Sequence, residues 1–229
     1  VFGGGSENTI QYISFSSEGD SLDFGDLTTN LSQMAGASNS TRGLFAGGNG
    51  PVNTIQYITI ASTGNATDFG DLNESRRNLG GSASSTRAVF GSGQTSSVDT
   101  NRIDYVTIAS TGNATDFGDL TVARYASASC SSSTRAIWAG GGDSEINTID
   151  YITIASTSNA TDFGDLITGT RLNTACSSEV RGVIAGGVAD TNTIEYVTIA
   201  STSNALDFGD LISGGYWLGS CSSAHGGLS

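Results

Sequence analysis

The chain contains five copies of one repeat unit, and its two ends fall inside a unit rather than between two units. The pentapeptide Asp-Phe-Gly-Asp-Leu starts at Asp23, Asp68, Asp116, Asp162 and Asp207. Successive copies lie 45, 48, 46 and 45 residues apart, and a tyrosine precedes each copy by eleven residues. A period in the forties is typical of propeller blades or solenoid units. One unit is divided between the termini, with residues 221–227 supplying its first strand and residues 1–5 the next, which predicts a closed ring.

One unit, residues 79–120, shows the strands that each repeat is expected to form. A run of small residues at 79–85 is followed by a short apolar strand at 87–91 that ends at glycine. β-Branched and aromatic residues fill positions 102–109, and turn residues then lead to an edge-like strand at 114–120. Four short strands per unit, without helical periodicity, predict a propeller blade.

These units are predicted to form a single domain over residues 1–229, because consecutive blades share continuous interfaces. The predicted fold class is all-β, a five-bladed β-propeller with four antiparallel strands per blade and repeats of about 46 residues. In this prediction, a C-terminal strand near residues 216–223 completes the blade begun at residues 1–27. The innermost strands carry small residues because they line a crowded channel.

The order of these features resembles the kelch repeat. A glycine pair such as Gly47-Gly48 is followed about ten residues later by a tyrosine, then by an aromatic outer strand and an arginine. Where kelch has tryptophan, this chain has phenylalanine: Phe24, Phe69, Phe117, Phe163 and Phe208. More narrowly, residues 192–205 are similar to kelch-like repeats in virion proteins of marine tailed phages. The resemblance covers the whole chain and implies a virion or extracellular location.

The charge of the chain argues against partners that are bound by basic surfaces. The net charge is −13, and all nine basic residues are arginines. Nucleic acids and anionic membranes are recognised through basic patches, so neither is an expected partner. No segment has the roughly 18 apolar residues of a membrane span, so membrane insertion is not expected. Because the first residue is Val1 rather than methionine, we expect a processed product or part of a longer protein.

No arrangement of residues predicts catalysis or a cofactor. His225 is the only histidine, so a Ser-His-Asp triad has no support. The acids repeat in every unit, as structural residues do, whereas an active site is unique. The Asp-Phe-Gly-Asp units are expected to be turns and outer strands; the alternative, one Ca²⁺ per blade, would need more oxygen ligands than each unit supplies. We therefore expect a protein without enzymatic activity, cofactor or metal.

Three cysteines, Cys130, Cys176 and Cys221, stand at equivalent places in consecutive units, where other units have Ala37 and Ser82. This pattern predicts small side chains in the inner strands. The alternative is a thiol cluster at the channel, although no Cys-x-x-Cys or Cys/His spacing typical of metal sites is present.

Three turns match the N-glycosylation sequon, at Asn65, Asn113 and Asn159, but the fourth copy at Asn204 breaks it. Turn geometry is therefore the preferred interpretation of these asparagines.

Two sets of arginines recur near the inner strands. The first set, with aromatic residues at matching places, forms the candidate binding residues: Arg77, Arg124, Arg171, Tyr125, Tyr216 and Trp217. Arg, Tyr and Trp are enriched at binding hot spots, and Ser32 at a matching place breaks the symmetry. The second set is nearly invariant and is expected to pair with acids between blades: Arg42, Arg87, Arg135 and Arg181.

Variable loops are the expected docking surface, because loops can differ without disturbing the core. They span residues 3–8, 47–53, 91–101, 140–147 and 186–192.

Two functions fit these observations. The first is a non-enzymatic structural or interaction module of a phage particle, which contacts other virion proteins or the host surface. The second is a lectin that binds glycans at repeated shallow sites, since tachylectin-type lectins share the blade count and repeat length but not this motif. A lectin keeps its site residues equal in every unit, whereas these loops diverge, which favours docking to one partner. An intracellular scaffold is a more distant third.

Overall fold

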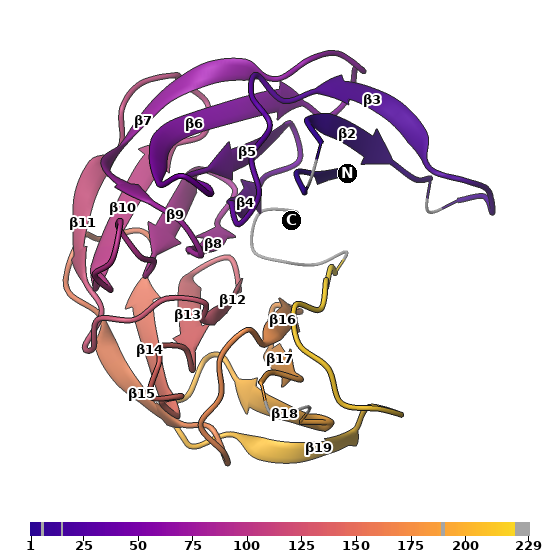
Figure 1. Ribbon diagram of the computed structural model, residues 1–229. Coiled ribbons are helices and arrows are strands. Elements are labelled where there is room, and N and C mark those ends of the chain that lie inside the picture. The colour runs from indigo at the N-terminus through magenta and orange to yellow at the C-terminus, as the bar shows by residue number, and fades with distance from the viewer. Residues whose placement is uncertain (6, 15, 189–190, 223–229) are drawn as a thin grey trace.

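The computed structural model is an all-β ring of five antiparallel sheets, which form a five-bladed β-propeller (Figure 1). It describes residues 1–222 except residues 6, 15, 189 and 190. The predicted fold class is therefore confirmed. Within these residues, no helix has the length and apolar character that a membrane span requires.

The strands follow one another through the blades in chain order. The first blade contains β1 (Phe2–Gly3), β2 (Thr9–Tyr12) and β3 (Leu22–Asp26). The second contains β4 (Ala35–Ser38), β5 (Arg42–Ala46), β6 (Val52–Thr59) and β7 (Thr67–Arg76). The third contains β8 (Gly80–Ala83), β9 (Arg87–Gly91), β10 (Arg102–Thr107) and β11 (Thr115–Asp119). The fourth contains β12 (Ala128–Ser131), β13 (Arg135–Ala139), β14 (Thr148–Thr153) and β15 (Thr161–Asp165). The fifth contains β16 (Thr174–Ser177), β17 (Arg181–Ala185), β18 (Thr193–Thr198) and β19 (Leu206–Asp210).

The innermost strands β4, β8, β12 and β16 lie around the centre of the molecule (Figure 1). Their residues line a central cavity of about 710 Å³. Their side chains are small because neighbouring inner strands approach closely. A Cβ at Gly81, for example, would lie 2.5 Å from the carbonyl oxygen of Gly36 in the adjacent blade. The prediction of small residues around a crowded channel is confirmed.

Neighbouring blades pack through the aromatic residues of the repeat. In every blade, the tyrosine of the repeat packs edge to face against the phenylalanine of the pentapeptide, with ring centroids 5.7 to 5.9 Å apart. Phe117 is 2% exposed and belongs to a core cluster with Trp138 and Ile152 of the next blade. The hydrophobic core therefore lies between blades, and each blade depends on its neighbour for burial.

The glycine of the pentapeptide lets adjacent blades approach. Gly118 has a φ of +140°, and a Cβ there would lie 2.5 Å from the carbonyl oxygen of Ser158. The next residue, Asn159, accepts a hydrogen bond from the backbone N–H of Asp119 at 3.1 Å. Its equivalents Asn65, Asn113 and Asn204 make the same contact. This contact accounts for the asparagine at Asn204, where the sequon is broken, and supports the turn interpretation.

The second set of arginines also joins neighbouring blades, but with different partners from those predicted. Each guanidinium lies over the tyrosine of its own blade, with Cζ 4.5 to 4.7 Å from the ring centroid. Three of them donate hydrogen bonds to backbone carbonyls of the next blade: Arg42 to Ile108, Arg87 to Ile154 and Ala155, and Arg135 to Ile199. The inter-blade role is confirmed, and the expected pairing with acids is wrong. A guanidinium has several donors, so it can satisfy carbonyls that the strands leave unpaired.

The C-terminal segment occupies the place of a fifth inner strand without forming one. The backbone N–H of Trp217 donates to the carbonyl of Leu172 at 3.1 Å, and Ser220 Oγ donates to the carbonyl of Ala175 at 2.7 Å. Residues 216–222 nevertheless contain no strand, and residue 223 lies outside the described part of the chain. Among the described residues, the first blade therefore contains three strands, and the predicted fourth is not formed by residues 216–222. Strand β1 spans only two residues, so a strand beside it would gain few hydrogen bonds.

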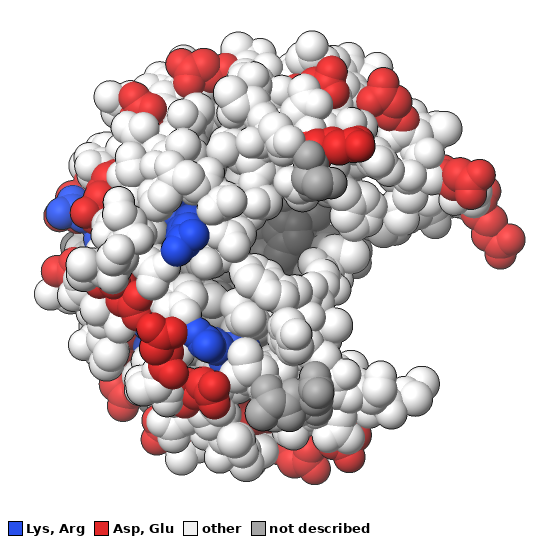
Figure 2. Space-filling model, viewed as in Figure 1, with Lys and Arg blue, Asp and Glu red and all other residues white. Residues whose placement is uncertain are grey.

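The ring is open between the fifth blade and the first (Figure 1 and Figure 2). Phe208 on β19 is 55% exposed, whereas its four equivalents are at most 4% exposed. At Gly209, no described atom lies within 4 Å of an added Cβ, although Gly118 in the same motif is closely packed. The described residues therefore do not form the predicted closure; residues 223–227 of the predicted closing strand lie outside them.

Candidate functional site

One mouth of the channel is encircled by five equivalent residues that differ in type. The residue after each of them has a positive φ of 54° to 60°: Gln33, Asn78, Ala126, Leu172 and Trp217. Four backbone hydrogen bonds of 2.9 to 3.1 Å join these residues in a chain around the mouth. These hydrogen bonds identify equivalent positions in the five blades. We call the residues that immediately precede them the rim: Ser32, Arg77, Tyr125, Arg171 and Tyr216.

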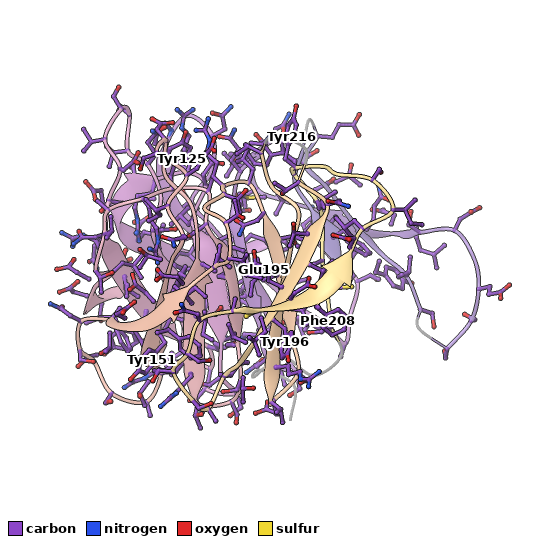
Figure 3. All side chains as sticks on the ribbon, turned by 90° about the horizontal axis from the view of Figure 1, so that it is seen from below. Tyr125, Tyr151, Glu195, Tyr196, Phe208 and Tyr216 are labelled. Carbon is purple, nitrogen blue, oxygen red and sulfur yellow. The ribbon has the colours of Figure 1, made fainter. Side chains whose placement is uncertain are left out.

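Four of the six predicted binding residues lie on this rim, namely Arg77, Tyr125, Arg171 and Tyr216. Figure 3 shows Tyr125 and Tyr216 at the same end of the molecule. Trp217 follows the rim, lines the channel cavity and is 56% exposed.

Arg124 does not belong to the rim, so its assignment as a surface binding residue is wrong. Its side chain is 0% exposed and pairs with Asp150 at 2.9 Å. Its structural equivalent is Arg76, which the sequence reasoning passed over. Arg76 and Arg124 each follow the first aspartate of the pentapeptide by eight residues, whereas Arg171 follows it by nine. That spacing was the signal that separates buried from exposed arginines.

On one side of the rim, three side chains form an exposed polar cluster. The Tyr125 hydroxyl donates to Asp143 Oδ1 at 2.6 Å, and Arg171 Nη1 lies 2.6 Å from the same oxygen. Arg171 Nη1 also donates to the Tyr125 hydroxyl oxygen, and its guanidinium lies over the tyrosine ring. Asp143 belongs to the variable loop 140–147, so this loop is tied to residues that precede β12 and β16. The contacts hold an aromatic ring and a guanidinium in a fixed arrangement at the surface.

Arg77 forms a second cluster with two other loops. It donates to Gln94 Oε1 at 2.9 Å and to Asn49 Oδ1 at 3.4 Å. Among the described residues, no carboxylate lies within ion-pair distance of its guanidinium. Its positive charge is therefore left without a direct counter-charge on the rim.

The surface around the channel mouth differs in charge from the rest of this face. Figure 2 shows two basic areas beside the channel, while acidic side chains lie mainly farther out. On a protein with a net charge of −13, arginine side chains therefore stand beside the channel mouth.

Beneath the rim, two buried ion pairs fix the segments that carry it. Arg76 Nη2 lies 2.6 Å from Asp104 Oδ2, and both side chains are 0% exposed. Burial lowers the pKa of Arg76, and the neighbouring carboxylate of Asp104 acts in the opposite direction. The pair formed by Arg124 and Asp150 is arranged in the same way. These pairs anchor the two segments that carry the rim residues Arg77 and Tyr125.

The three cysteines line the channel: Cys130 on β12, Cys176 on β16 and Cys221 on the C-terminal segment, which forms no strand. Burial raises the pKa of Cys130 to about 12. The neighbouring Cys176 also raises this pKa by a smaller amount, and a hydrogen bond with Ser177 lowers it. Burial also raises the pKa of Cys176, and Cys221 adds to this effect. In the described part of the chain, no three His, Cys, Asp or Glu side chains are placed to hold a metal ion. His225 lies outside that part.

We expect the thiols to differ strongly in reactivity, because the thiolate is the nucleophile. With an aromatic disulfide reagent at pH 8, exposed Cys221 should react first and Cys130 only after unfolding. The readout is absorbance of the released thiolate, with Cys221→Ser as the control that removes the fast phase. Fast modification of Cys130 in the folded Cys221→Ser variant would contradict the burial described here.

Fold and rim together define a five-bladed β-propeller with an asymmetric polar and aromatic surface at one channel mouth. Comparison with known proteins adds no family to this description, since no protein-family model matches the chain and no curated protein is significantly similar to it.

Proposed function

We propose that this protein is a non-enzymatic interaction module that docks one macromolecular partner through its rim and the adjoining loops. The supporting observation is where the repeat symmetry fails. The residues that hold blades together recur in unit after unit, whereas the five rim positions carry Ser, Arg, Tyr, Arg and Tyr. A surface that does not follow the five-fold repeat suits one asymmetric partner.

The chemistry of the rim fits a protein partner. Arginine, tyrosine and tryptophan supply large contact areas and are enriched among the residues that dominate binding energy at interfaces. Tyr216 and Trp217 are both more than half exposed. Because the repeats resemble those of phage virion proteins, the proposed setting is a virion, in contact with another virion protein or with the host surface.

A lectin is the second candidate, because exposed Tyr216 and Trp217 stand beside a channel lined by serine hydroxyls. Repeated sugar sites have less support. The asparagine that recurs in four turns already bonds to the neighbouring blade. A glycan array with and without Ca²⁺ tests this candidate, and saturable binding to one sugar class would replace docking as the proposed function.

The docking proposal is tested by binding of purified protein to virus particles, measured by co-sedimentation. The double variant Arg77→Ala/Tyr216→Ala should bind about tenfold to a hundredfold more weakly, as expected for hot-spot residues. Arg181→Ala is the matched control, because exposed Arg181 lies at the end of β17 farthest from the rim. Equal loss in both variants, or no binding by the unaltered protein, would refute docking through the rim.

A further inference from the structure

The fifth blade contains a buried carboxylate that lacks the arginine found in two other blades. Glu195 is 5% exposed and occupies the place of Asp104 and Asp150. The strand registers establish this equivalence, because Glu195 is opposite Ile184 as Asp104 is opposite Phe90. The place of the arginine is taken by Thr170, which leaves Glu195 without a cationic partner among the described residues.

In the third blade, the equivalent site around Asp104 holds the guanidinium of Arg76. We call this site the socket. The guanidinium of Arg76 donates to the carbonyls of Ser92 and Arg102, each at 2.8 Å, and to Asp104 Oδ2 at 2.6 Å. The carbonyl of Phe90 completes the surroundings at 3.5 Å. The socket is therefore a set of backbone oxygens around one carboxylate, built to surround a positive charge.

In the fifth blade the same socket is a small pocket. The residues equivalent to Phe90, Ser92 and Arg102 line it: Ile184, Gly186 and Thr193. Glu195 and Thr170 line it as well, and its volume is about 10 Å³. A volume of this size accommodates about one water-sized particle, so an arginine side chain from a partner does not fit.

Two further observations indicate that the pocket favours a positive charge. The hydroxyl oxygen of Thr191, which also lines it, is buried without a hydrogen-bond partner. Asp207 faces Glu195 directly across the pair of strands β18 and β19 and adds a second negative charge nearby. One oxygen of Glu195, Oε2, accepts the backbone N–H of Ile167 at 2.8 Å, which fixes the carboxylate in the socket.

We propose that this pocket binds one monovalent alkali cation, Na⁺ or K⁺, against Glu195, in the place that Arg76 and Arg124 occupy in the third and fourth blades. Hard cations prefer carboxylate, carbonyl and hydroxyl oxygens, which are the groups present. A single lining carboxylate balances a single positive charge. Ca²⁺ takes six to eight oxygen ligands and generally more than one carboxylate, so the socket suits a monovalent ion better.

The ion would complete the fifth blade in the way that an internal arginine completes its neighbours. Thr170 immediately precedes the rim residue Arg171, so the ion would also order the segment that carries one side of the rim. The cation site is independent of the docking proposal, because it would stabilise the fold whether or not the rim binds a partner.

The test is thermal unfolding at pH 8 in NaCl or KCl, compared with choline chloride at equal ionic strength so that screening is constant. A ligand of the folded state raises Tm by mass action, and we expect a saturable rise of roughly 2–4 °C with one of the two alkali ions. Glu195→Gln should abolish this rise. The variant copies Gln56, which stands at the same place in the second blade and accepts the backbone N–H of Thr28 at 2.7 Å.

Thr170→Arg provides the complementary variant, because it supplies the missing guanidinium. Its Tm should no longer depend on Na⁺ or K⁺. Crystals grown with Rb⁺ in place of K⁺ should show an anomalous peak beside Glu195. Equal melting in all three salts would show that the pocket holds only water and would overturn the proposal. A larger stabilisation by Ca²⁺ than by either alkali ion, or a cation effect that persists in Glu195→Gln, would overturn it as well.

Discussion

Replacing Asp104 by asparagine is expected to lower the free energy of unfolding by about 3–5 kcal/mol, the usual cost of removing one charged partner from a buried ion pair. The variant leaves the guanidinium of Arg76 charged and 0% exposed, with carbonyl groups as its remaining partners. Urea denaturation followed by tryptophan fluorescence measures the loss, because the slope reports the surface exposed and the midpoint reports stability.

The chain itself supplies the control for this experiment. In the second blade the equivalent positions are Leu31 and Gln56, so the double variant Arg76→Leu/Asp104→Gln copies a pair that the protein already uses. Replacing a whole buried ion pair is often neutral, and we expect the double variant to recover most of the stability. If Asp104→Asn alone cost less than about 1 kcal/mol, the typical value for surface pairs, the pair would not be buried in solution.

Truncating Phe117 to alanine is expected to cost about 3–5 kcal/mol, whereas the same change at Phe208 should cost little. Both residues occupy the same position of the pentapeptide and both stack on the tyrosine of their blade. They differ in burial, because the next blade covers Phe117 (2% exposed) and nothing described covers Phe208 (55% exposed). The difference in cost therefore measures the contribution of one inter-blade interface.

Urea midpoints of the two variants, measured side by side, show whether the first blade packs against the fifth blade in solution. A small effect at Phe208 agrees with the open ring of the structure. An effect at Phe208 as large as that at Phe117 would show that the first blade packs on β19 in solution and that the ring closes. Phe163→Ala serves as a second buried reference, since Phe163 is also 2% exposed.

The repeat was sufficient to predict the architecture of the blades. A strand needs only a short alternating segment and a turn, and both are local in sequence. Because each unit repeats the same signals, an error in one blade is corrected by the other four. The places of the small inner residues, the tyrosine and the pentapeptide phenylalanine could therefore be predicted before any contact was known.

The partners of the polar residues could not be predicted in the same way. Arg42 and its equivalents bond to carbonyls of the next blade, and Arg124 is buried, because these outcomes depend on which groups the assembled blades leave unpaired. In the sequence, the buried and the exposed arginines differ only in standing eight or nine residues after the first aspartate of the pentapeptide. The two arrangements become distinct only when one guanidinium points into the blade and the other lies on the rim.

The number of blades, the course of each strand and the residues of the core could be predicted from the repeat alone, since they follow from local patterns at a fixed period. The tertiary structure alone decided which arginines are exposed, which carboxylate lacks a counter-charge and where the ring remains open. The reason is physical. Burial and charge compensation depend on contacts between segments that are distant in sequence: Asp150 pairs with Arg124, 26 residues away, whereas Thr170 stands at the equivalent place beside Glu195.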